Sequence, residues 1–281
     1  MSVLVVGSLH LDVVLRAPHL PRVDETVTGS AVTYVFGGKG GNQALAAARM
    51  GGRTHFAGRA GSDRFGDMLR ETLQTSGIDL SQLQHDTGPS GMSAAILNAD
   101  GDYGAVIVSA ANLNIDAEQI HIPTGTTLVL LQNEIPEAVN LAIAQKARDA
   151  GAQVWLNAAP ARLLPDDLIG LIDLLILNRV EADFYSNETR FAKILTTLGA
   201  QGVVFEGNDH PAPKVKAHSS HGAGDMFVGA LAAQVDAGKT LPEAIDFAQA
   251  AAALHVASDD VARATLSAKK VATFLNAQSN R

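Results

Sequence analysis

A short glycine-rich segment, Gly222-Ala223-Gly224-Asp225, has the composition of an anion site with a base beside it. It runs into a predicted helix over 228–235. Small residues ahead of a helix leave its first amide N–H groups exposed, and these groups attract phosphates. Asp225 could then accept a proton from a substrate hydroxyl while the amides hold developing phosphate charge. The alternative is a glycine-rich turn in which Asp225 only caps the helix.

A second glycine-rich segment, Gly37 to Asn42, also stands between a predicted strand and a predicted helix. Glycines let a ligand approach the backbone closely, and Lys39 and Asn42 could hydrogen-bond a polyol. The segment is not a Walker A loop, because no Ser or Thr follows Lys39. It does not read G-x-G-x-x-G either, which counts against a dinucleotide-dependent oxidoreductase. A tight turn without a ligand is the alternative here.

Three further acidic positions follow predicted strands. Asn178 and Glu181 come after a strand over 174–177, and the carboxyl ends of parallel strands are where open α/β sheets bind ligands. Their spacing could orient hydrated Mg²⁺, which prefers oxygen ligands, although a helix cap has the same pattern. Asp12 and Glu134 also follow strands and could bind sugar hydroxyls, but each is weak evidence by itself.

The composition excludes several classes of protein. The chain has 281 residues, 47% of them hydrophobic, which is enough for a substantial core. The absence of cysteine rules out disulfides, thiolate metal sites and cysteine nucleophiles. A net charge of −8 with no run of Lys or Arg argues against nucleic-acid binding. No apolar run is long enough for a membrane span, and no signal peptide is visible, so we expect a cytoplasmic protein.

Strand and helix patterns alternate along most of the chain. Strands are predicted over 3–6, 54–58, 127–132, 154–157 and 174–178, and helices over 43–50, 65–74, 136–150, 230–257 and 267–277. This alternation predicts an α/β fold, with a mostly parallel central sheet covered by helices on both faces.

Two segments do not fit the alternation and are expected to form a small separate β-sheet lid. They cover about 13–36, with strands at 26–28 and 32–35, and about 93–108, with a hairpin turn over 99–102. Residues 188–218 show little regular pattern.

In this order, the motifs make the chain similar to the ribokinase (PfkB) family of carbohydrate kinases. The resemblance covers nearly the whole chain and rests on residues 5–8, 36–44, 157–162, 178–181, 197–199, 222–225 and 241–245. It implies one ribokinase-like αβα domain over 1–281 that often dimerises through its lid. It also implies transfer of the γ-phosphoryl group of ATP, with Mg²⁺, to the primary hydroxyl of a sugar.

The resemblance also implies roles for individual residues. Asp225 would be the catalytic base, and Gly222, Ala223 and Gly224 the anion hole. The sugar-contacting positions would be His10, Asp12, Gly38, Lys39, Asn42 and Glu134. The ATP-binding positions would be Asn178, Thr197, Gly199 and Gly202, while Glu181 would act on Mg²⁺ through water.

Three departures from the family pattern bear on function. Ser219-Ser220 replaces an Asp-Thr pair whose Asp helps to hold an activating monovalent cation, so we expect activity that is nearly independent of potassium. His10 replaces an Asn of the sugar site. The interval from Asn178 to Asp225 is shorter than usual. The leading hypothesis is phosphorylation of ribose, or a related pentose, to the 5-phosphate. The alternatives are a nucleoside kinase on the same fold and a catalytically silent sugar-binding or regulatory protein.

Overall fold

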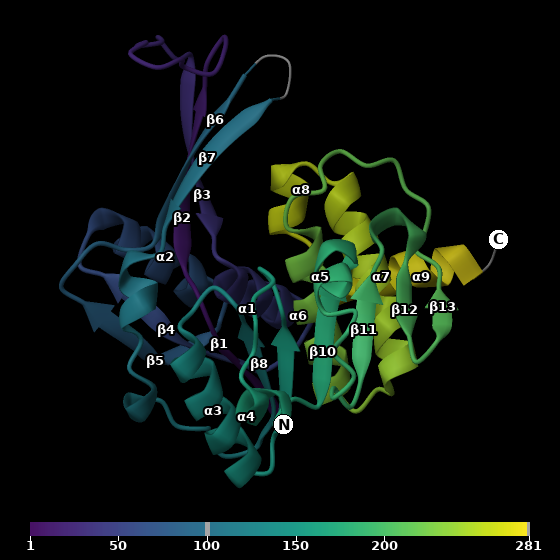
Figure 1. Cartoon of the computed structure of the whole chain (residues 1–281). Helices are drawn as coiled ribbons and strands as arrows, with labels where there is room; N and C mark the ends of the chain where they lie inside the picture. The colour runs from purple at the N-terminus through teal and green to yellow at the C-terminus, as the bar shows by residue number, and fades with distance from the viewer. Residues whose placement is uncertain (99–101, 280–281) are drawn as a thin grey trace.

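The computed structural model describes residues 1–98 and 102–279, which form a large and a small β-sheet (Figure 1). The large sheet has nine strands in the order β13 (Asn208–His210), β12 (Val203–Phe205), β11 (Ile194–Thr197), β10 (Leu174–Asn178), β9 (Gln153–Asn157), β8 (Thr126–Gln132), β1 (Ser2–Val6), β4 (Thr54–Gly61) and β5 (Asp79–Asp86). Neighbouring strands from β11 to β5 are parallel, whereas β12 and β13 are antiparallel additions at one edge.

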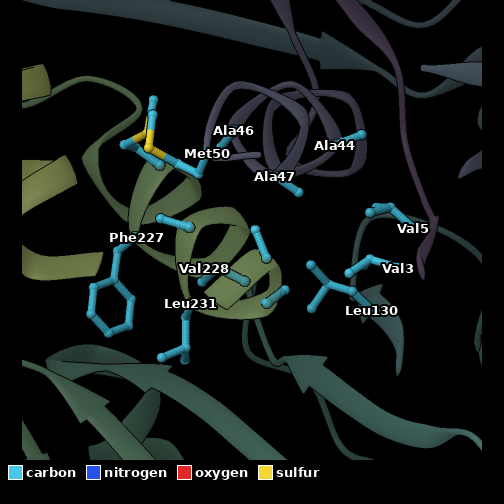
Figure 2. Close-up of a cluster of buried hydrophobic side chains, with 14 of the residues drawn as sticks. Val3, Val5, Ala44, Ala46, Ala47, Met50, Leu130, Phe227, Val228 and Leu231 are labelled. Atoms are coloured by element: carbon cyan, nitrogen blue, oxygen red, sulfur yellow. The ribbon is translucent and has the colours of Figure 1, made fainter. Parts of the chain in front are cut away.

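Helices cover both faces of the large sheet. Their bounds are α1 (Lys39–Arg49), α2 (Arg64–Thr75), α3 (Glu137–Asp149), α4 (Asp166–Ile169), α5 (Arg179–Phe184), α6 (Ala223–Asp236), α7 (Leu241–Ala257), α8 (Asp260–Ala264) and α9 (Ala268–Ser279), with short 3₁₀ turns at Ala110–Asn114, Ala117–Gln119 and Gly199–Gln201. Successive strand residues point into opposite cores. Val3, Val5 and Leu130 pack with α1 and α6 (Figure 2), whereas Leu4 and Val6 pack in the core that includes α3. Burial on both faces explains the continuous apolar runs of these strands.

The small sheet projects from the body of the molecule (Figure 1). Its order is β3 (Ala31–Gly37), β2 (His10–Arg16), β6 (Met92–Leu97) and β7 (Tyr103–Val108), so the segments near 13–36 and 93–108 supply its strands. Since β2 follows β1 after three residues, the small sheet is joined to the carboxyl edge of the large one.

The predicted alternation of strands and helices is confirmed, but four local predictions are wrong or incomplete. Residues 26–28 form no strand, and the irregular region 188–218 contains β11, β12 and β13. The predicted helix over 230–257 is two helices, because Gly238 (φ 88°) ends α6 and a capping box at Thr240 starts α7. Strand β5 was not predicted because it is a polar edge strand. Residues 99–101 of the predicted turn lie outside the described residues.

Helices α1 and α6 lie unusually close together at Gly229. A Cβ atom at this position would lie 2.4 Å from the carbonyl oxygen of Gln43 and 2.5 Å from the Cβ of Ala46. Only hydrogen fits there, and the small side chains of Ala46 and Ala47 complete the contact (Figure 2). This close approach fixes how the two helix starts face each other.

We expect Gly229→Ala to destabilise the protein by about 1–3 kcal/mol, as overpacked cores generally do. Alanine is normally favoured in a helix, so a loss of stability would show that the clash with the α1 backbone dominates. Chemical denaturation would measure the difference. Gly104→Ala is the control, because an added Cβ there meets no atom of the described residues within 4 Å. Equal or higher stability of Gly229→Ala would contradict the prediction.

Candidate active site

Residues far apart in the sequence meet at the carboxyl edge of the large sheet. The strand order reverses at β1, which lies between β4 and β8, and such a reversal is where open α/β sheets bind ligands. A cavity of about 160 Å³ opens here. Its lining includes the separately predicted Thr197 and residues from all three predicted motifs: Lys39, Asn178, Glu181, Gly222, Ala223, Gly224 and Asp225. The structure therefore brings the two glycine-rich segments and the Asn178–Glu181 pair into one site.

Asp225 lies in the first turn of α6, but it does not cap this helix. Gly222 occupies the N-cap position with φ 73°, and no side chain in the described part of the chain caps the helix there. The Asp225 carboxylate instead accepts hydrogen bonds from α1: Gln43 Nε2 donates to Oδ1 at 3.0 Å, and Asn42 Nδ2 donates to Oδ2 at 3.3 Å. The carboxylate is thus held in place while it lines the cavity.

Opposing effects act on the pKa of Asp225. Burial raises this pKa, and the negative charge of Glu134 raises it further, whereas the Lys39 ammonium and the hydrogen bonds from Gln43 and Asn42 lower it. A carboxylate with a raised pKa is a better proton acceptor than a free aspartate, provided that it is still ionised at the working pH.

Some, but not all, of the backbone N–H groups in the first turn of α6 are available to bind an anion. The N–H of Ala223 already donates to Ser220 O at 3.2 Å. The N–H groups of Gly224 and Asp225 belong to the first turn, where a helix offers no acceptor of its own. Gly224 is exposed at the cavity. Of the predicted anion hole, Gly224 thus has the N–H best placed for a phosphate, with that of Asp225 next to it.

Glu134 is the centre of a cluster that includes three other predicted sugar-side residues, His10, Gly38 and Lys39. Its Oε2 accepts hydrogen bonds from Ser8 Oγ at 2.5 Å and from the backbone N–H of Lys39 at 2.8 Å. His10 Nδ1 lies 3.9 Å from the same oxygen. Gly38 (φ 89°) lies so close to the backbone that follows β1 that a Cβ atom would be 2.8 Å from the backbone nitrogen of His10. Gly38 therefore has to be glycine for Lys39 to reach Glu134.

His10 and Asp12 stand side by side on β2 with different surroundings. Asp12 accepts a hydrogen bond from Ser93 Oγ at 2.5 Å and is covered by Gly37. His10 is only 5% exposed, and among the described residues its Nε2 has no hydrogen-bond partner. Burial lowers the pKa of His10 despite the nearby carboxylates of Glu134 and Asp12, which favours a neutral ring. A buried ring nitrogen without a partner is suited to meet a ligand hydroxyl.

Asn178 and Glu181 form the predicted helix cap and also line the cavity. The Asn178 side chain accepts from the N–H groups of Val180 and Glu181, at 2.8 and 3.0 Å. Glu181 in turn accepts from the backbone and side chain of Asn178, at 2.7 and 2.8 Å. Burial raises the pKa of Glu181, whereas these bonds lower it. The cap therefore fixes one buried carboxylate at the cavity wall.

A larger groove of about 380 Å³ continues from the small cavity. The two share Thr197, Ser220, Ala223 and Gly224, and the groove also contains the predicted Gly199 and Gly202. The rest of its lining was not predicted from the sequence: Ala200, Val203, residues 212–215 and 217, Phe227, Gln249, Ala252, Ala253 and Val256. This groove is mainly apolar and lies beside the anion-binding amides, as a nucleotide base and sugar would require.

Gln249 is the most informative residue that sequence reasoning missed. It is 5% exposed, and among the described residues its Oε1 has no hydrogen-bond partner. It lies in α7 amid a run of alanines, so a polar residue on an apolar helix was the available signal.

Comparisons with known proteins agree with this geometry. The model of the pfkB family carbohydrate kinases matches residues 1–267. Ribokinase from Bacillus subtilis is 32% identical over 276 residues, covering 92% of this chain and 93% of that protein. Among solved structures, ribokinase from Thermotoga maritima superposes with a TM-score of 0.86 at 28% identity, covering 98% and 99% of the two chains. Arabidopsis thaliana ribokinase, complexed with ribose and ATP, gives a TM-score of 0.88 at 28% identity, with 98% of both chains covered. The chain belongs to the pfkB family of carbohydrate kinases.

Proposed function

We propose that this carbohydrate kinase transfers the γ-phosphoryl group of ATP to the primary hydroxyl of ribose. The observation that carries the proposal is the position of Asp225. It lines one cavity with Lys39 and the first amides of α6, between the Glu134 cluster and the apolar groove. The Arabidopsis relative that binds ribose and ATP supports the choice of both substrates. A base placed between two such regions also argues against a silent binding protein.

In the proposed mechanism, Asp225 accepts the proton of the ribose hydroxyl as its oxygen attacks the γ-phosphorus. Asn42 and Gln43 orient the carboxylate. The N–H groups of Gly224 and Asp225 and the Lys39 ammonium would stabilise the charge on the transferred phosphoryl group. Such a reaction depends on positioning and electrostatic stabilisation rather than on a covalent intermediate.

The residues present fit a magnesium ion held largely by the nucleotide. No group of three or more His, Asp or Glu side chains able to hold a metal occurs in the described part of the chain. Glu181 is a single buried carboxylate at the cavity, which suits an ion that keeps several waters and binds phosphates. Mg²⁺ would supply charge neutralisation, and Glu181 would orient one of its waters.

The small sheet has the surface for a homodimer. Leu15, Val32, Tyr34, Val106 and Val108 are exposed, and the strand register places them on one face. An exposed apolar face of this kind commonly marks an interaction surface, and we infer pairing with the same sheet of a second copy. Light scattering tests this inference by comparing Val106→Asp with Leu163→Asp, which changes an even more exposed apolar residue on the body of the molecule.

The proposed kinase activity also bears on where the protein is located and what it binds. No helix in the described residues is long and apolar enough to cross a membrane. We infer a cytoplasmic enzyme with small-molecule substrates and no nucleic-acid partner.

Ser219 offers a hydroxyl where a carboxylate would bind a cation, so activity should change little when potassium is replaced by tetramethylammonium at equal ionic strength.

Asp225→Asn should lower kcat by about 10²–10⁴-fold, the usual contribution of a general base. The amide keeps the shape of the side chain but cannot accept the proton, so sugar binding should be nearly unchanged. ADP release with ribose, other pentoses, hexoses and nucleosides would be measured for both proteins. A variant with the wild-type kcat would exclude Asp225 as the base. A clear preference of the wild type for nucleosides would overturn the assignment of ribose.

The charges around Asp225 predict opposite shifts in the pH profile. The base must be ionised, so kcat/KM falls as the pH drops through the pKa of Asp225. Lys39→Met removes a charge that lowers this pKa and should move the acid limb to higher pH. Glu134→Gln removes a charge that raises it and should move the limb to lower pH. Profiles of kcat/KM measured from about pH 5 to about pH 9 would show both shifts. Two shifts of the same sign would mean that another group controls the limb.

His10→Asn should change which sugar is preferred while leaving ATP use unaltered. The substitution replaces His10 Nε2, which no described residue hydrogen-bonds, by a shorter amide, and a site built for one hydroxyl pattern rejects another. The ratios of kcat/KM among ribose and its epimers are the measurement. Unchanged ratios would place His10 outside the sugar site.

A further inference from the structure

The loop that leads into the anion-binding amides is held by one neighbouring region of the chain. The N–H groups of His218 and Ser219 both donate to Val256 O, at 2.7 and 3.1 Å. His255 Nε2 lies 2.9 Å from His221 O, and since a carbonyl only accepts, the ring nitrogen is the donor. His255 and Val256 both lie in the last turn of α7. The position of the loop therefore depends on the end of this helix.

Arg263 adds a charged tether between the same two segments. Its Nη2 donates to Ser219 O at 2.7 Å, and its Nε donates to His255 O at 2.9 Å. Ser219 belongs to the loop, whereas the His255 carbonyl lies at the C-terminal end of α7, where the helix dipole favours a cation. The planar guanidinium can bond both carbonyls at once, which an ammonium group does less well.

We propose that Arg263 is a positioning residue for phosphoryl transfer. Ser219 precedes Ser220, whose carbonyl accepts the N–H of Ala223 at the start of α6. Holding Ser219 therefore fixes the first turn of α6, which presents the N–H of Gly224 and the carboxylate of Asp225. A misplacement of about 1 Å can lower a rate by about 10²-fold. This role rests on the proposed function, because it assumes that these amides receive the phosphoryl group.

The competing explanation is that Arg263 only adds positive charge near the site. A comparison with Arg49 distinguishes this electrostatic effect from the tether. Arg49 and Arg263 line the same cavity of about 420 Å³, which also reaches Asp225. Burial is the main cause of the lowered pKa of His255, and both guanidinium groups lower it further. Within the described residues, however, Arg49 makes no hydrogen bond to residues 218–222. Arg49→Met thus removes a nearby charge without removing the tether.

The test compares Arg263→Ala with Arg49→Met in steady-state kinetics with Mg-ATP and ribose. We expect Arg263→Ala to lose at least about tenfold in kcat with the KM for ribose within about twofold, and Arg49→Met to stay within about twofold in both. Millimolar guanidinium chloride should restore part of the kcat of Arg263→Ala, since the cavity admits small solutes. Tetramethylammonium chloride at equal ionic strength should not. Absence of rescue, or equal losses in both variants, would overturn the proposal.

Amide hydrogen exchange provides a readout that needs no substrate. Exchange at 218–224 should be faster in Arg263→Ala than in the wild type or Arg49→Met, and guanidinium should slow it again. Unchanged exchange overturns the tether even if ribose proves to be the wrong sugar, so the two proposals can fail separately. If Arg263→Ala does not fold, Arg263→Gln replaces it, because the shorter amide cannot bond the carbonyls of Ser219 and His255 at once. The same faster exchange and lower kcat are then expected, and wild-type exchange and kcat in that variant would overturn the tether.

Discussion

The packing of α6 against α1 is the contact on which the site depends. Both helices begin at the carboxyl edge of the large sheet with a glycine-rich segment. Gly229 lets the α6 backbone approach Gln43 and Ala46 so closely that no side chain fits between them. That distance brings Asp225, one turn earlier on α6, within hydrogen-bond reach of Asn42 and Gln43. The two glycine-rich motifs are therefore parts of a single helix-pair contact.

A buried chain of amides extends this contact into the sheet. Gln43 Nε2 donates to Asp225 Oδ1 and to Asn157 Oδ1, each at 3.0 Å, and Gln43 Oε1 accepts from Gln132 Nε2 at 2.9 Å. Asn157 ends β9 and Gln132 ends β8, so the carboxylate is tied to two strands. In an apolar interior, breaking one link would leave a buried polar group without a partner, which costs more than the bond itself is worth. The network thus holds Asp225 in one orientation.

The sequence predicts those parts of the molecule that follow from local chemistry. Continuous apolar strands such as Val3 to Val6 can only lie in a sheet covered on both faces, so the α/β architecture was predictable. Each glycine-rich segment alone is also typical of a tight turn, and the two were recognisable because they occur together and in a characteristic order along the chain. In contrast, β5 is a polar edge strand, and the break between α6 and α7 depends on one glycine with positive φ inside an alanine-rich stretch.

The unpredicted half of the site is the half that forms only through long-range packing. The apolar groove joins residues 212–217, which have no regular structure, to the side of α7, and no local pattern relates these two segments. Gln249 can be assigned to the site only because it lines that groove and its Oε1 has no hydrogen-bond partner among the described residues. The sugar side, by comparison, is built from residues that lie on β2 or soon after β1, β3 and β8, at positions that the predicted strands and the glycine-rich segment already mark. The first turn of α6 belongs to both halves, since its amides line the small cavity and the groove alike. Whatever fixes that turn, from α1 on one side and from the end of α7 on the other, aligns the two substrates with each other.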